Sequence, residues 1–128
     1  MLGDAPRAGL PVAVPLRHHY LMTIIDAITD QHLFRPLFKN LDSWRAWLVV
    51  LKSIFALEMN SEEKAVFTSL TGRASPPTTQ VEECWIVAGR RSGKSRIAAL
   101  VAVFLGAFKN YDQHRSAGER IAAFFYVA

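Results

Sequence analysis

The sequence predicts an α/β fold, in which N-terminal helices precede the start of a parallel sheet. Two apolar runs, residues 84–88 and residues 121–128, have the length and composition of buried strands. Between them lie a turn that contains glycine and a long apolar pattern of helical type, from Arg96 to Phe108. Parallel strands joined by a helix form a right-handed crossover, so residues 81–128 are expected to be the first β-α-β unit of a larger, truncated sheet.

The composition is that of a globular chain with unevenly placed charge. The chain has 128 residues, of which 51% are hydrophobic, enough to form a core in one small domain or in a piece of a larger one. Residues 86–128 carry 7 basic and 2 acidic side chains, a net charge of +5, whereas residues 1–85 carry a net charge of −1. This asymmetry suits a polyanionic ligand such as a nucleotide or DNA, although scattered solvated arginines would give the same count.

Two further features bear on the compartment in which the protein works. Cys84 is the single cysteine, so the chain has no internal disulfide and a reducing compartment is expected. The apolar stretch from Ile97 to Phe108 is too short to span a bilayer, so no membrane association is expected.

The first part of the chain is expected to form a flexible leader, residues 1–17, and a helical region, residues 18–80. Apolar residues at helical spacing predict helices over residues 20–29, 42–55 and 61–71. The expected N-caps are Asp42 or Ser43 for the second helix and Ser61 for the third, which should stop at Gly72.

Trp44 and Trp47 lie on the apolar side of the second of these helices. An aromatic pair of this kind could stack on a base, but its helical spacing favours a face buried in the core.

The stretch that precedes the long apolar helix has the composition of a phosphate-binding loop. Glycines allow a tight turn whose backbone N–H groups point at phosphates, a lysine places positive charge on the β- and γ-phosphates, and a serine hydroxyl can bind Mg²⁺. The expected ligands are therefore ATP and Mg²⁺, with Ser95 as the metal ligand. The expected phosphate-contacting residues are Gly89, Arg90, Arg91, Ser92, Gly93, Lys94 and Ser95.

The match to the pattern Gly-x-x-x-x-Gly-Lys-Ser/Thr departs at its first position, where Ala88 replaces glycine. The alternative is an ordinary turn between a strand and a helix that happens to contain Gly-Lys-Ser. The flanking strand and helix patterns favour the phosphate-binding interpretation.

Residues 33–128 resemble the N-terminal part of the large terminase subunit of tailed bacteriophages, the ATP-driven motor that packages DNA. The segments that carry the resemblance are Asp42-Ser43-Trp44-Arg45-Ala46-Trp47, Thr71-Gly72-Arg73, the loop from Gly89 to Ser95, and Gly118-Glu119-Arg120 before an apolar run. The loop is the most specific of them, because terminases often carry an arginine where Arg90 stands, three residues before the Gly-Lys pair.

The resemblance implies roles and partners. Lys94 and Arg90 would be the catalytic residues, with Arg90 stabilising charge on the γ-phosphate or simply attracting phosphate. The full-length protein would be an ATP hydrolase in the cytoplasm of the bacterial host. It would work on double-stranded DNA with the portal protein and the small terminase subunit, as an oligomeric ring on the procapsid. The acid that binds Mg²⁺, the catalytic glutamate and the nuclease domain of that family would lie beyond Ala128, so these 128 residues alone are expected to be inactive.

Two alternatives remain open at the level of the sequence. One is a fragment of another P-loop NTPase, of the helicase-like or AAA type. The other is a non-catalytic remnant that folds poorly or serves only as an interaction module.

Overall fold

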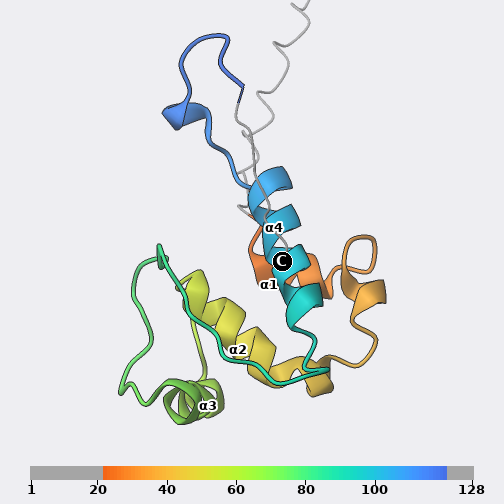
Figure 1. The fold of residues 1–128 in the computed structure, drawn as a ribbon, viewed down its shortest axis with the longest axis vertical. Coiled ribbons are helices and arrows are strands. Elements are labelled where there is room, and N and C mark those ends of the chain that lie inside the picture. Colours follow the sequence, from red (N-terminus) through yellow and green to blue (C-terminus); the bar gives the residue numbers. More distant parts are fainter. Residues whose placement is uncertain (1–21, 121–128) are drawn as a thin grey trace, which may run out of the picture.

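The computed structural model describes residues 22–120, in which four α-helices and three short 3₁₀ helices make up the regular structure. The expected leader and the expected strand over residues 121–128 lie outside the described residues. Figure 1 shows a first group, α1 and α4, which overlap in this view, and a second group, α2 and α3, below and to the left of them. The long connection from Gly72 to Gly93 joins the second group to α4.

The first elements are short and held by local caps. Helix α1, Ile24–Thr29, begins with a capping box, in which Thr23 and Asp26 satisfy each other's backbone N–H groups. The 3₁₀ helices η1, Arg35–Leu37, and η2, Leu41–Trp44, follow. Helix α1 is shorter than the expected helix over residues 20–29.

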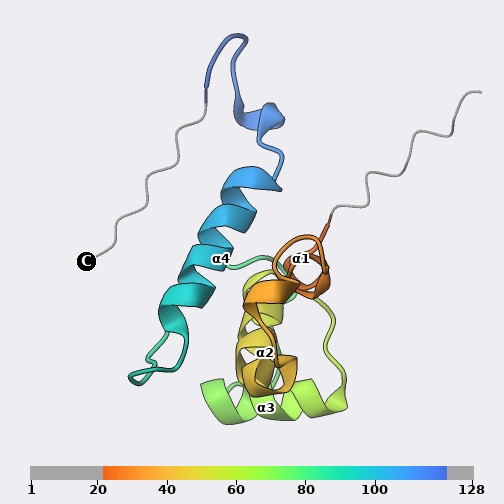
Figure 2. The same ribbon diagram turned by 90° about the vertical axis from the view of Figure 1, so that its right-hand side faces the viewer.

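Helices α2 and α3 are neighbours joined by a short loop, and Figure 2 shows α3 lying across the lower end of α2. Helix α2, Arg45–Ile54, starts directly after η2, whose cap is Asn40 rather than the expected Asp42 or Ser43. Helix α3, Ser61–Thr71, is capped by Asn60 in a second capping box with Glu63, not by Ser61. It stops at Gly72 in the left-handed conformation (φ 70°), as the sequence predicted.

Helix α4, Lys94–Ala107, follows the glycine loop and supplies one side of the core. Its buried residues Ile97, Leu100 and Phe104 pack with residues of α1 and α2. The main cluster of fully or nearly fully buried side chains comprises Ile24, Ala27, Ile28, Phe38, Leu51, Ile97, Leu100 and Phe104. The core therefore lies between α1, α2 and α4, and it fixes the start of α4 against the start of α2. Within residues 22–120, no helix has the length and apolar character needed to cross a bilayer.

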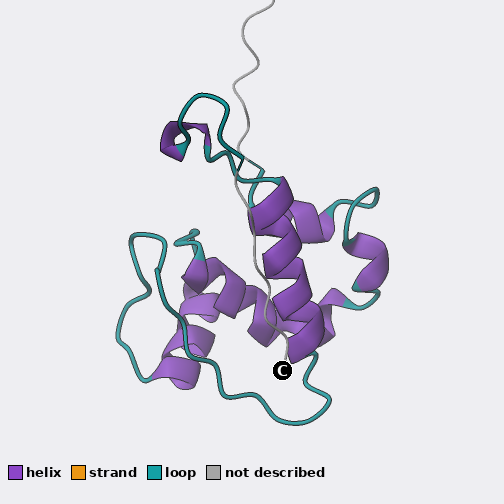
Figure 3. Cartoon of the chain, turned by 45° about the horizontal axis from the view of Figure 1, so that its top comes forward, coloured by secondary structure: helices purple, strands orange, loops and turns teal. Residues whose placement is uncertain are grey.

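The predicted parallel sheet is wrong for the part of the chain that the structure describes. Residues 84–88 run as a loop, and no strand occurs between residues 22 and 120 (Figure 3). Trp85 is 88% exposed and Val87 fully exposed, so the apolar run is not buried.

Residues 84–88 do not form a strand because no neighbouring segment within residues 22–120 pairs with their backbone. Apolar and β-branched residues favour an extended backbone, but the N–H and C=O groups become a strand only when a second chain segment pairs with them. Within the described chain the backbone N–H of Val81 bonds to the Ile54 carbonyl (3.0 Å), and no comparable backbone bond continues along residues 82–92.

Candidate phosphate-binding loop

The loop before α4 has an unusual sequence of backbone conformations. Arg91 has φ 60° and Gly93 has φ 85°, and Ser92 between them is not among the residues with positive φ. Residues in the left-handed conformation next to right-handed ones turn successive N–H groups towards one concave side, as in the anion-binding nests of other proteins. Only Gly93 adopts such a φ without steric cost, whereas Arg91 adopts it at a cost of about 1 kcal/mol.

The N-terminus of α4 is open to a ligand. Its N-cap, Gly93, has no side chain that could accept a hydrogen bond from the first turn. The first intrahelical bond runs from the Ile97 N–H to the Gly93 carbonyl (3.1 Å). The N–H groups of Lys94, Ser95 and Arg96 consequently have no acceptor within residues 22–120. Free N–H groups and the positive end of the helix dipole both favour an anion at this point.

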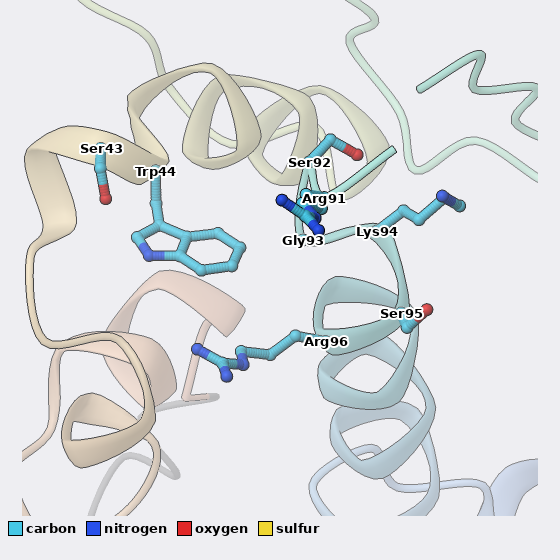
Figure 4. Close-up of a pocket in the computed structure, with 8 residues that line it drawn as sticks. All are labelled: Ser43, Trp44, Arg91, Ser92, Gly93, Lys94, Ser95 and Arg96. Carbon is cyan, nitrogen blue, oxygen red and sulfur yellow. The ribbon is translucent and has the colours of Figure 1, made fainter. Parts of the chain in front are cut away.

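A pocket of about 670 Å³ lies over the loop and the start of α4 (Figure 4). Three of its lining side chains are cations, Arg91, Lys94 and Arg96, and none is a carboxylate. The full lining is Ser43, Trp44, Arg91, Ser92, Gly93, Lys94, Ser95 and Arg96. The pocket is therefore electropositive from both side chains and backbone.

The structure brings together five of the seven residues expected to contact phosphate. Residues 91–95 line the pocket, whereas Gly89 and Arg90 do not. Lys94 is the first residue of α4, and its Nζ lies 3.5 Å from the Gly89 carbonyl oxygen, so the side chain reaches back over the loop. Ser95, in the first turn, is exposed, and the side chains of Lys94 and Ser95 lie on the same side of α4 in Figure 4.

Ser92 contributes a second polar group to this region. Its Oγ is buried and has no hydrogen-bond partner among the described residues. Buried hydroxyl groups nearly always have a partner, so Ser92 Oγ is an exception that lies in the middle of the loop.

Two tryptophans, Trp44 of η2 and Trp47 of α2, contact the loop. Both are also partly buried against the core, as their spacing in the sequence predicts. The Trp47 indole Nε1–H donates a hydrogen bond to the Ser92 carbonyl oxygen (2.6 Å). The Trp44 ring lies so close to Gly93 that a Cβ atom there would overlap its Cη2 and Cζ3 atoms. The spacing of the two tryptophans is visible in the sequence, but the contact between them and the loop depends on the path of the chain, which the sequence pattern does not show.

Arg96 ties the same corner to the N-terminal elements. Its guanidinium lies over the Trp44 ring, 5.7 Å from the ring centroid, and donates a hydrogen bond to the Leu37 carbonyl (3.0 Å). Figure 4 shows Trp44 and Arg96 facing each other beside the loop. Arg96 therefore contributes charge to the pocket and packing to the fold at once.

The acids that follow the loop in the sequence are not part of the pocket. Asp112 pairs with Arg115 (3.3 Å), and Glu119 accepts a hydrogen bond from the Ser116 backbone N–H (2.9 Å). Both lie beyond the C-terminal end of α4, whereas the loop precedes its N-terminal end (Figure 1). No cluster of three or more His, Cys, Asp or Glu side chains occurs within residues 22–120, which leaves the Ser95 hydroxyl as the predicted metal ligand.

No protein-family description, curated protein or solved structure matches this chain. The resemblance to large terminase subunits rests on the motifs of the sequence alone.

Proposed function

We propose that the loop and the first turn of α4 bind the phosphate groups of ATP, together with Mg²⁺. The observation that carries the proposal is the joint placement of two residues with positive φ, Arg91 and Gly93, and an uncapped helix N-terminus in one pocket lined by three cations and no carboxylate. A polyphosphate carries the charge that such groups bind. It would have to lie across the N-terminal end of α4, because Lys94 and Ser95 point to one side of this helix and Arg96 to the other (Figure 4).

The individual roles follow from position. Lys94 supplies a compact charge for the β- and γ-phosphates, and its present contact, a single 3.5 Å approach to the Gly89 carbonyl, is weak enough to exchange for a phosphate oxygen. Ser95 supplies one hydroxyl, so Mg²⁺ would arrive with the triphosphate and take most of its ligands from phosphate and water. Arg90 is exposed and does not line the pocket, and its proposed role is to reach the γ-phosphate from outside it.

The wider role that we propose is that of a nucleotide-binding part of a DNA-packaging motor similar to the large terminase subunits. The support is the sequence of the loop, with Arg90 three residues before Gly93-Lys94, and the tryptophan-containing segment that precedes it. Such a motor would act on double-stranded DNA, with a portal protein and a small terminase subunit, in the cytoplasm of a bacterial host.

The first prediction concerns Lys94. Lys94→Ala should weaken the binding of ATP–Mg²⁺ by about tenfold or more, because a charge-assisted contact contributes about 1.5–3 kcal/mol. The dissociation constant can be measured by isothermal titration calorimetry on the whole chain.

The matched control is Lys64→Ala, because Lys64 is an exposed lysine of α3 outside the pocket. Lys64→Ala should leave the affinity for ATP–Mg²⁺ unchanged. It therefore controls for the loss of one positive charge, which both substitutions cause. Equal effects of the two substitutions would show that the protein attracts ATP only through its net charge, and would refute the site.

A further inference from the structure

We infer that Trp47 and Trp44 are positioning residues of the phosphate loop, which set the direction of its N–H groups without touching the ligand's phosphates. The inference rests on the proposed function and extends it to residues of α2 and of the turn before it. It is carried by two contacts across a long stretch of sequence: the indole bond to Ser92 and the close approach of Trp44 to Gly93.

The Trp47 bond acts through the geometry of one peptide group. In a trans peptide the C=O of one residue and the N–H of the next point in opposite directions. The Trp47 Nε1–H holds the Ser92 carbonyl towards α2 at 2.6 Å, so the Gly93 N–H of the same peptide must point away from α2. Rotation of this peptide would replace a donor with a carbonyl oxygen, which repels phosphate.

The Trp44 ring restricts the same peptide from its other end. It leaves no room for a side chain at Gly93, and its own position is fixed on both sides. Phe38 packs edge-on against it, with ring centroids 4.8 Å apart, and the Arg96 guanidinium covers it at 5.7 Å. These two neighbours fix the position of the Trp44 ring, and the ring in turn limits the positions that the loop can adopt.

The two contacts therefore give the loop its binding shape before any ligand arrives. A preorganised donor set avoids the ordering cost that a free glycine-containing loop would incur on binding. The inference assigns this task to tryptophans about 45 residues upstream in the sequence.

The test compares Trp47→Phe with Trp85→Phe. The first removes the indole donor and keeps an aromatic ring, and the second makes the same substitution at a ring that is 88% exposed. Trp47→Phe should weaken ATP–Mg²⁺ binding about tenfold, the order of one lost hydrogen bond, whereas Trp85→Phe should leave it unchanged. Both dissociation constants are measured by calorimetry on the whole chain.

A second measurement separates positioning from mere folding. In a ¹H–¹⁵N spectrum of the wild-type chain, the Trp47 indole N–H resonance should shift on addition of ATP–Mg²⁺, and the Trp85 indole resonance should not. In Lys94→Ala the Trp47 resonance should stay in place at the same ATP concentration. Because these spectra do not use the Trp47→Phe variant, they test the positioning role of Trp47 even if that variant fails to fold.

The outcomes are distinct. If the wild-type chain binds no ATP, the proposed function fails and this inference fails with it. If the wild-type chain binds ATP but Trp47→Phe binds equally well, or the Trp47 resonance does not respond, the site stands and the positioning role is refuted.

Discussion

Gly93 is the residue at which backbone conformation and packing meet. Its φ of 85° lies in the left-handed region, and the Trp44 ring occupies the space that a side chain would need. Gly72 offers a natural comparison, because it has a similar φ of 70° but nothing within 4 Å of the position of a Cβ atom. Comparison of substitutions at the two glycines therefore distinguishes the free-energy cost of a positive φ from that of steric overlap with Trp44.

The prediction at this scale is that Gly93→Ala destabilises the chain more than Gly72→Ala does. Gly72→Ala should cost about 1–2 kcal/mol, the price of a left-handed alanine, and Gly93→Ala should cost more because Trp44 must also move. Urea unfolding of both variants measures the difference. Only Gly93→Ala should also weaken ATP–Mg²⁺ binding, and equal losses of stability would contradict the packing that the structure gives Trp44.

The sequence could predict the glycine loop but not its neighbours. Gly93-Lys94-Ser95 followed by an apolar helix is a local pattern, and the helix begins at Lys94. Helical spacing correctly placed Trp44 and Trp47 against the core, but it shows only that residues share a face and not which other segment they contact. Which segment meets that face depends on the route of residues 72–93, and no local propensity encodes that route.

Helices α2 and α3 are held together by an ion pair and a shared cap. The Lys52 Nζ lies 2.7 Å from Glu63 Oε1, and both side chains are largely buried, 20% and 18% exposed. Glu63 also accepts a hydrogen bond from the Asn60 backbone N–H (2.9 Å). Burial raises the pKa of the Glu63 carboxyl, but the hydrogen bonds from Lys52 and Asn60 and the charge of Lys52 outweigh it, so the pKa lies below its ordinary value of 4.5.

This pKa gives a prediction for pH. A carboxyl with a depressed pKa in the folded state contributes stability that is fully present above its unfolded pKa and is lost as the pH falls through the folded pKa. The free energy of unfolding should therefore decrease as the pH falls below about 4.5. Glu63→Gln should be less stable than wild type at pH 7 and should lose less stability on acidification.

Urea unfolding at pH 7 and at pH 3.5 to 4 measures both quantities, with these pH values chosen about the ordinary carboxyl pKa. The control is Glu62→Gln, because the Glu62 side chain is 78% exposed in its contact with Arg45 and an exposed pair adds little. A pH dependence in Glu63→Gln equal to that of wild type would contradict the role of this carboxylate.

The helices show what periodicity and capping chemistry can predict. The apolar spacing gave α2, α3 and α4 nearly at their observed positions, and Gly72 gave the end of α3. The caps lie one to three residues before the expected ones, because Asn40 accepts a hydrogen bond from the Asp42 N–H and Asn60 accepts one from the Glu63 N–H. The sheet failed for a different reason, since pairing of strands is a property of two distant segments and not of either one.

At the scale of the whole molecule, the phosphate pocket and the acids Asp112 and Glu119 lie at opposite ends of α4. The helix has 14 residues, which corresponds to a length of about 20 Å. Hydrolysis of a phosphoanhydride needs a group that orients the attacking water, and no carboxylate lines the pocket.

We therefore expect the 128-residue chain to bind ATP–Mg²⁺ without appreciable turnover. Phosphate release from the purified chain should not exceed that of its Lys94→Ala variant. Turnover that disappears in Lys94→Ala would refute this expectation. The residue that activates the attacking water would then be sought by substitution of two acids. Asp42 lies next to the lining residue Ser43, and Glu82 lines a second pocket to which Trp47 and Lys94 also contribute.

The hydrogen bond between Trp47 and Ser92 also has a consequence for the order of events in folding. Helices α2 and α3 are neighbours in the chain and can pack as soon as each forms, whereas this bond closes a stretch of 45 residues. Closure of a long stretch of chain costs entropy, and the contacts that form offset this cost only when both ends are already structured. The loop should then take its shape late in folding and lose it early in unfolding, so its lifetime is shorter than that of the helices on which it rests.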